Sequence, residues 1–140
     1  MTQQELLKKL IDNLAKGYSN GLIVVGQTGI GKTETTLQAL REMKLNEKEH
    51  YFYLANYITP RGFLEVLEEV NKLNEPKILV LDYIENTLRS IATLGILKGA
   101  IWEAGGRRRV FWRTNRDKIE IEFFGKVIIL LNYFNIKNPV

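Results

Sequence analysis

The sequence predicts an α/β protein with a parallel β-sheet that is covered by helices on both faces. Segments with helical spacing of apolar residues alternate along the chain with short, continuously apolar segments, which are typical of buried parallel strands. The 140 residues are 45% apolar and 26% charged, as in an ordinary globular domain. We therefore expect residues 1–140 to form one domain, with an N-terminal helix in 1–17 and a basic β-hairpin inserted at 105–124.

The first half of the chain predicts two strand-helix units after an initial helix. Apolar residues keep helical spacing from residue 5 to residue 14, and Gly17 ends that pattern. An apolar run at 22–25 indicates a buried strand, and the composition of 32–43 favours a helix. A strand rich in aromatic residues follows at 51–55. Thr59 and Pro60 then have the residue types of a helix N-cap and a first helical position, and that helix is expected to continue to Asn74.

The second half predicts two more buried strands, separated by a helix and a hairpin. Ile78–Leu81 is continuously apolar. A helix is expected from about residue 87 to residue 102, and Gly105 and Gly106 close it. Apolar and polar residues alternate in 107–113 and again in 118–123, which predicts two antiparallel strands with a polar, basic tip between them. Val127–Leu131 is the last buried strand.

A phosphate-binding motif lies between the first predicted strand and the second predicted helix. Its spacing is Gly26-x-x-x-x-Gly31-Lys32-Thr33. In such a loop, backbone N–H groups and the positive end of the helix face the phosphates, the lysine reaches the β- and γ-phosphates, and the threonine hydroxyl binds Mg²⁺. The alternative is a glycine-rich turn with a solvated lysine, which the flanking strand and helix disfavour. We expect a bound nucleotide to contact Gly26, Gln27, Thr28, Gly29, Ile30, Gly31, Lys32, Thr33 and Glu34.

Two further polar residues end predicted buried strands. Asp82 follows Ile78–Leu81, and Asn132 follows Val127–Leu131. Ligands bind at the carboxyl ends of strands in open α/β sheets, so Asp82 is predicted to hold Mg²⁺ together with Thr33. The Asn132 amide offers both a donor and an acceptor for the γ-phosphate or the attacking water. Taken singly, a strand-capping aspartate and a turn asparagine would be the simpler interpretations.

Composition excludes several kinds of site and location. The chain has no cysteine and one histidine, so disulfides, thiolate sites and a histidine-built zinc site are not expected. The N-terminus lacks the apolar region of a secretory signal, and no apolar run is long enough to span a bilayer. We expect a cytoplasmic protein without a membrane partner, in the host cytoplasm if it is viral.

The loop, the run that ends at Asp82 and the run that ends at Asn132 together resemble the core of AAA+ ATPases, where the last position is called sensor 1. The hairpin before that strand is similar to the pre-sensor-1 hairpin of a branch that includes superfamily-three helicases. The stretches "KILVLDYIEN" and "FFGKVIILLN" look like those of small replication ATPases of phages, plasmids and archaeal viruses. The resemblance covers about residues 20–134 and implies an ATPase that uses ATP and Mg²⁺, acts on DNA and assembles with further copies, as a ring in some relatives.

The sequence departs from that family at the catalytic acid and after Asn132. Tyr83 stands where the family has a second acid, which leaves Glu85 as the nearest candidate for the base that activates water. The alternative for Glu85 is an exposed glutamate, and Asn56 is either a switch residue for the base or a turn residue. Residues 133–140 leave no room for a helical lid and contain no arginine. Either the sequence is a truncated form of the family core, or a partner protein or a neighbouring copy supplies these parts, with the hairpin arginines as candidate donors.

The predicted hairpin concentrates positive charge. Residues 105–118 contain six basic residues and one acidic residue, in a chain whose formal net charge is +4. Exposed Lys and Arg bind nucleic-acid phosphates and exposed aromatic rings stack on bases, so the charge and the resemblance together favour DNA contact at the tip. In ring-forming relatives the tip points into the central channel, and the resemblance thereby implies that DNA contacts Arg113, Arg116 and Lys118. The alternative is a solvated hairpin whose arginines pair with glutamates across the strands. For Trp112 we expect packing against the body of the protein.

The predicted function is an ATP-driven protein of DNA replication, such as an initiator, helicase or loader. Two other classes share the phosphate-binding loop. One is a module that binds ATP without hydrolysing it, which Tyr83 favours; the other is a small kinase, for which no acceptor site is evident. A GTPase is disfavoured because no glycine lies three residues after Asp82 and no Asn-Lys-x-Asp motif stands in a suitable place.

Overall fold

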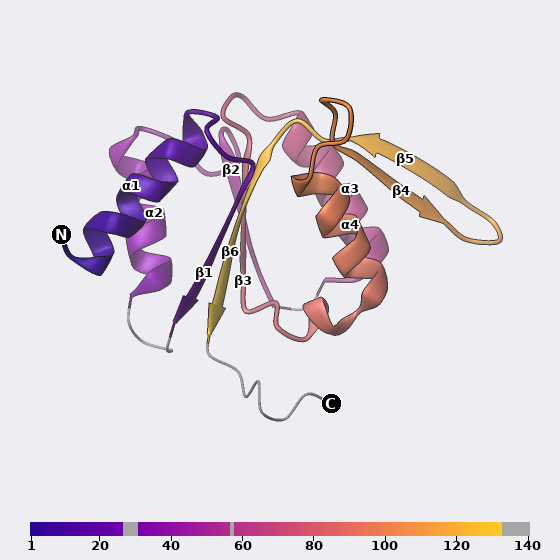
Figure 1. Ribbon diagram of the computed structural model, residues 1–140, viewed down its shortest axis with the longest axis horizontal. Helices are drawn as coiled ribbons and strands as arrows, with labels where there is room; N and C mark the ends of the chain where they lie inside the picture. The colour runs from indigo at the N-terminus through magenta and orange to yellow at the C-terminus, as the bar shows by residue number, and fades with distance from the viewer. Residues whose placement is uncertain (27–30, 57, 133–140) are drawn as a thin grey trace.

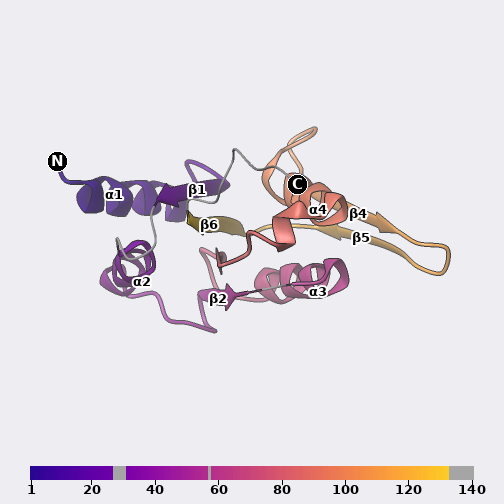
Figure 2. The same cartoon turned by 90° about the horizontal axis from the view of Figure 1, so that it is seen from below.

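The computed structural model describes residues 1–26, 31–56 and 58–132. A parallel four-stranded sheet, in the order β1-β6-β3-β2, lies between α1 and α2 on one face and α3 and α4 on the other (Figures 1 and 2). This three-layer α/β arrangement confirms the predicted fold class and is compatible with a P-loop NTPase fold. The elements are α1 (Gln3–Ala15), β1 (Gly21–Gly26), α2 (Lys32–Glu42), β2 (Tyr51–Ala55), α3 (Pro60–Asn71), β3 (Ile78–Asp82), η1 (Thr87–Arg89), α4 (Ile91–Ile101), β4 (Arg109–Arg113), β5 (Lys118–Glu122) and β6 (Lys126–Asn132).

Hydroxyl side chains fix the starts of three helices. Thr2 and Glu5 form a capping box at α1, and the Thr59 hydroxyl accepts a hydrogen bond from the Gly62 N–H, which confirms the predicted cap of α3. The prediction of one helix from 87 to 102 was wrong at its start. Ser90 has an extended backbone and its hydroxyl accepts from the Thr93 N–H, so the short turn η1 ends there and α4 starts afresh.

The last strand of the chain lies in the middle of the sheet. β6 pairs with β1 on one side and with β3 on the other, both in parallel. The register sets Asn132 level with Gly26 of β1, and Leu130 level with Asp82 of β3. The last residues of the three adjacent strands β1, β6 and β3 therefore lie along one edge of the sheet, at the foot of Figure 1, where ligands bind in open parallel sheets.

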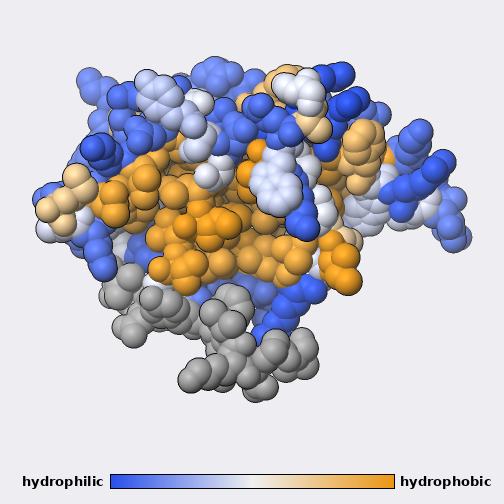
Figure 3. All heavy atoms as spheres, in the orientation of Figure 1, coloured by the Kyte–Doolittle hydropathy of each residue, from blue (hydrophilic) through white to orange (hydrophobic). Residues whose placement is uncertain are grey.

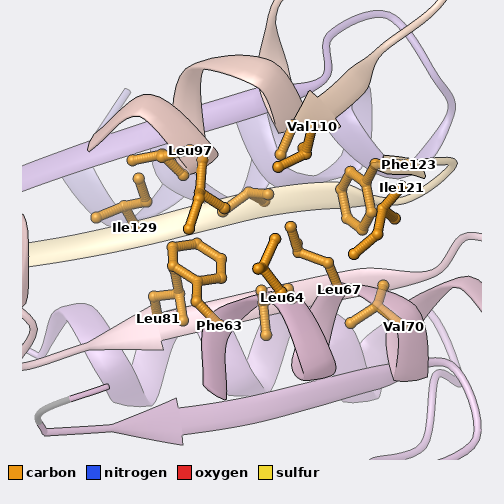
Figure 4. Packing of buried hydrophobic residues seen from close by; sticks show 14 of the residues in the cluster. Phe63, Leu64, Leu67, Val70, Leu81, Leu97, Val110, Ile121, Phe123 and Ile129 are labelled. Carbon is orange, nitrogen blue, oxygen red and sulfur yellow. The ribbon is translucent and has the colours of Figure 1, made fainter. Parts of the chain in front are cut away.

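Two apolar cores flank the sheet. The core under α1 and α2 includes Ile11, Leu40 and Val80, all fully buried or nearly so. The larger core on the opposite face joins α3, α4, the sheet and the hairpin, and Figure 4 shows its side chains interlocking around Phe63 and Leu67 of α3. Parallel sheets need such cover on both faces because neither face can meet water without exposing apolar side chains.

The hairpin β4–β5 is anchored to the larger core at its base. Val110, Ile121 and Phe123 are buried against α3 and α4 (Figure 4), and Trp112 packs on the same cluster, which confirms the packing predicted for Trp112. Arg108 is 8% exposed; its Nη1 donates hydrogen bonds to the carbonyls of Ala100 and Gly125, so it links α4 to the start of β6. The outer half of the hairpin extends beyond the body (Figure 1).

An apolar surface surrounds β1 and extends toward α4. Figure 3 shows apolar side chains gathered across the middle of this face, and Ile23 and Val25 of β1 are 58% and 50% exposed. Within the described residues, β1 pairs with β6 alone, so its other edge carries no strand. None of the helices in the described ranges is long and apolar enough to cross a membrane.

Candidate nucleotide-binding site

The start of α2 has the backbone that the phosphate-binding motif requires. Gly31, which precedes the helix, has φ +80°, a left-handed conformation that glycine adopts without strain. Lys32 and Thr33 then occupy the first turn, where free N–H groups and the helix dipole favour an anion. Gly26 ends β1 beside this turn. The predicted contacts at Gln27, Thr28, Gly29 and Ile30 lie outside the described residues.

Lys32 meets Asn132 at the edge of the sheet. Lys32 is 7% exposed, and its Nζ donates to Asn132 Oδ1 at 2.9 Å and to the Gly26 carbonyl at 3.2 Å. These residues lie 100 positions apart in the chain, and β6 brings them together because it lies directly beside β1. The lysine ammonium and the asparagine amide therefore face the same space. Two groups that bind one γ-phosphate need this arrangement.

Asp82 receives hydrogen bonds from three directions. Its Oδ2 accepts from the Thr33 hydroxyl at 2.6 Å and from the Tyr53 hydroxyl at 2.8 Å, while Oδ1 accepts from the Tyr83 N–H at 3.0 Å. Asp82 is 3% exposed. Burial and the bond to this carboxylate raise the pKa of Tyr53 well above its ordinary value, so its phenol stays a neutral donor. No signal in the sequence predicted Tyr53 at this site.

Thr33 and Asp82 fit a magnesium ion that is shared with phosphates. A small cavity of about 140 Å³ is lined by Gly31, Lys32, Thr33, Glu34, Asp82, Tyr83 and Asn132. Within the described ranges no three His, Cys, Asp or Glu side chains gather into a metal cluster. Mg²⁺ requires no such cluster, because it commonly binds one or two protein oxygens and completes its octahedron with phosphate and water. The hydroxyl and the carboxylate are the donors that this ion prefers.

Glu85 contacts the end of the Asn132 strand. Its Oε1 accepts a hydrogen bond from the Asn132 N–H at 2.9 Å, and the residue is half-buried, so the alternative of an exposed glutamate was wrong. The carboxylate thereby ties the segment after β3 to the last residue of β6. Asn56 is exposed with φ +76°, and its N–H donates to the Asp82 carbonyl at 3.1 Å, which is the contact of a turn residue.

A larger groove adjoins the small cavity at Gly31 and Lys32. Its volume is about 730 Å³, within the range of pockets for small ligands. Apolar side chains such as Leu7, Leu10 and Leu22 form much of its lining, and the side chains of Gln3 and Gln4 add amide groups. The groove runs from the start of α1 along β1 to the start of α2. A nucleotide whose phosphates lie at Lys32 can thus place its base and ribose here.

The outer face of the hairpin divides into a paired base and a basic tip. Arg107 is bound to Glu122 through two guanidinium nitrogens, which lowers the pKa of the Glu122 carboxyl, and Arg109 lies 4.0 Å from Glu120. This part of the hairpin follows the solvated, cross-strand alternative. Arg108 is buried and cannot reach a ligand on the outer face.

The tip of the hairpin carries like charges directly opposite one another. Arg113 and Lys118 are cross-strand partners, and Arg116 lies exposed in the turn between them. Like charges in opposed positions destabilise a hairpin, so an anion that binds here would relieve their repulsion. Phe111 is 62% exposed on the same face of β4. The three cations predicted to contact DNA are therefore together and accessible.

The fold and the convergence of Lys32, Thr33, Asp82 and Asn132 are compatible with a P-loop NTPase fold. The comparison with protein families agrees: residues 1–61 match the family described as "Type III restriction enzyme, res subunit", a helicase-like P-loop ATPase family. This match covers the loop, β1, α2 and β2, and it supports the P-loop superfamily rather than the AAA+ type in particular. A comparison with curated proteins found no match.

Proposed function

We propose that this chain is an ATPase domain of a DNA-processing protein, of the AAA+ pre-sensor-1 hairpin type, acting in replication as an initiator, helicase or loader. The observation that carries the proposal is the pair of contacts Lys32–Asn132 and Thr33–Asp82 at one edge of the sheet. They unite an anion-binding lysine and an amide with two oxygen ligands for a metal. The similarity of residues 1–61 to a helicase-like family supports the link to DNA.

In this proposal each residue of the site has a separate task. Lys32 binds the β- and γ-phosphates, and N–H groups at the start of α2 orient them. Thr33 and Asp82 hold Mg²⁺, which when bound neutralises charge on the phosphates. Asn132 binds the γ-phosphate or the attacking water through its amide. Glu85 fixes the backbone at Asn132 through its hydrogen bond to the N–H. The alternative is that Glu85 is the general base, and the variant Glu85→Gln distinguishes these two roles.

The rate of ATP hydrolysis with and without DNA tests the function. Wild-type protein is expected to hydrolyse ATP, faster with single-stranded or duplex DNA, and Lys32→Ala is expected to abolish turnover. Tight ATP binding without turnover under any DNA condition would instead favour an ATP-dependent interaction module, for which the non-acidic Tyr83 beside Asp82 is the supporting observation. Phosphate transfer to a small acceptor would favour a kinase and refute both.

We infer that the basic tip contacts the DNA backbone through Arg113, Arg116 and Lys118. The double variant Arg116→Ala/Lys118→Ala is expected to weaken DNA binding and to lower the slope of log K against log salt by about 1.4–1.8, the effect of two lost phosphate contacts. Arg107→Ala/Arg109→Ala is a control with the same change of charge, since these arginines face Glu122 and Glu120. Equal slopes for both double variants would refute a contact specific to the tip.

The proposal also includes assembly with further copies or a partner protein. The exposed apolar side chains around β1 and the exposed arginines of the hairpin support it, because an arginine supplied across a subunit boundary accelerates phosphoryl transfer. The molecular mass in solution, measured with ATP and DNA, is the test. A mass equal to one chain under all conditions would refute self-assembly.

A further inference from the structure

Tyr53 reaches Asp82 from a neighbouring strand. Tyr53 lies in β2, level with Val80 of β3, while Asp82 lies two residues further along β3 and level with Ala55. Residues two apart in a strand lie on the same face, about 6.6 Å from each other. A phenol directed along the sheet spans this distance, and its hydroxyl lies 2.8 Å from Asp82 Oδ2. The contact thus depends on the register of the two strands.

The two hydroxyl groups on Asp82 Oδ2 differ in what else they do. Thr33 also belongs to the phosphate-binding loop, where its oxygen is needed as a metal ligand. Tyr53 lies on β2, outside that loop; its hydroxyl donates to the carboxylate, and its other side-chain hydrogen bond is with Thr33, the second residue on the same carboxylate oxygen. The Tyr83 N–H holds the other oxygen, Oδ1. With Oδ2 held from β2 and from the first turn of α2, and Oδ1 held by the residue after β3, the plane of the Asp82 carboxylate is fixed.

We propose that Tyr53 is a positioning residue that orients the Asp82 carboxylate toward the divalent cation of the bound nucleotide. The proposal rests on the proposed function, because it requires that Asp82 holds that cation. Groups that hydrogen-bond a metal ligand typically change metal affinity by about 10–100-fold when they are removed. Loss of the Tyr53 hydroxyl therefore weakens the Mg²⁺-dependent part of nucleotide binding and leaves the phosphate contacts of Lys32 in place.

Tyr51 provides a matched control for this inference. It lies two residues before Tyr53 on the same strand, is 5% exposed, and packs in the same core under α1 and α2. Tyr51→Phe and Tyr53→Phe both remove one phenolic hydroxyl from this face of β2 and both keep the ring. Only the second removes a hydrogen bond to Asp82. A difference between the two variants therefore reports the contact with the carboxylate rather than the loss of a hydroxyl from the strand.

The experiment measures binding of a fluorescent ATP analogue as Mg²⁺ is titrated, with metal-free binding in EDTA as a second measurement. Tyr53→Phe is expected to raise the half-saturating Mg²⁺ concentration about 10-fold or more, while metal-free binding and the thermal midpoint stay near those of wild type. Tyr51→Phe should titrate like wild type. In a chain that already carries Asp82→Ala, adding Tyr53→Phe should produce no further change in the Mg²⁺ titration.

The outcomes separate this inference from the proposed function. Wild-type protein that binds no nucleotide, with or without Mg²⁺, would refute the proposed function. Wild-type protein that binds Mg²⁺-dependently, with a Tyr53→Phe titration equal to its own, would overturn the positioning role alone. A further shift caused by Tyr53→Phe in the Asp82→Ala chain would also overturn it, because the tyrosine would then act through another group.

Discussion

Substitution of Glu85 distinguishes a residue that positions Asn132 from one that removes a proton from water. The Glu85 carboxylate accepts the Asn132 N–H at 2.9 Å, and the Asn132 amide in turn accepts from Lys32 at 2.9 Å. A glutamine in place of Glu85 keeps an oxygen for the first bond but cannot act as a base. An alanine removes both the acceptor and the base. We expect Glu85→Gln to retain ATP turnover within about tenfold of wild type, because weakening one charge-assisted bond changes its energy by less than about 1.4 kcal/mol, which is a factor of about ten in rate.

The alanine variant has a larger expected effect for a structural reason. It leaves the partly buried Asn132 N–H without its acceptor, which costs about 1–3 kcal/mol. That cost should appear in the free energy of unfolding, measured by denaturant titration, and as reduced turnover through displacement of the Asn132 side chain. Glu85→Gln should lose about 1 kcal/mol or less.

Steady-state ATPase rates and denaturant titrations of the three proteins test this reasoning. If Glu85 were the general base, glutamine and alanine would both reduce turnover by about 10²–10⁴-fold, since each removes the proton acceptor. A Glu85→Gln rate in that range, with the free energy of unfolding unchanged, would refute the positioning role. It would also establish the catalytic role predicted for Glu85 from its place after Asp82.

Three further predictions concern stability. Gly99→Ala should destabilise the fold by about 1–3 kcal/mol, because a Cβ there would lie 2.7 Å from the Arg109 carbonyl oxygen. Gly95→Ala on the same helix meets nothing within 4 Å and should stabilise the fold by about 1 kcal/mol. Denaturant titration of both variants is the check, and equal effects would contradict the prediction. Arg108→Met should cost about 2–4 kcal/mol by leaving the Ala100 and Gly125 carbonyls without their donor, and an unchanged unfolding midpoint would show that water replaces it. The pKa of Tyr53 is raised in the folded chain, so the folded chain keeps the phenol proton to higher pH than the unfolded chain, in which the tyrosine pKa is near 10.0. The free energy of unfolding should therefore fall as the pH rises above 10.0. The fall should be less steep in Tyr53→Phe.

The positions of the strand ends could be predicted because their sequence signals are local. A continuous apolar run followed by a polar residue marks both Asp82 and Asn132, and the glycine spacing marks the loop before Lys32. The start of α4 was missed for the opposite reason. Ser90 is tolerated inside helices, and only the hydrogen bond from the Thr93 N–H shows that it begins one.

The order of the strands could not be predicted from the runs themselves, because β3 and β6 are equally apolar. The structure sets β6 between β1 and β3, and this one fact determines the site. β6 joins β1, which ends at Gly26, to β3, which ends at Asp82. Without it the two strands would not be held in one sheet, and Thr33 would not lie within reach of the Asp82 carboxylate. The site is therefore completed by the last described strand, although its motif begins at residue 26.

Tyr53 shows why side-chain partners between strands escape sequence analysis. An aromatic residue in a strand is most often part of the core, and Tyr51 on the same face is such a residue. What distinguishes Tyr53 is the parallel register of β2 with β3, which sets its phenol two residues short of Asp82. A shift of the register by one residue would turn the phenol to the other face, so the contact depends on the pairing rather than on the residue type. The residue that we propose to orient the metal ligand Asp82 thus lies outside the motifs by which the site was predicted.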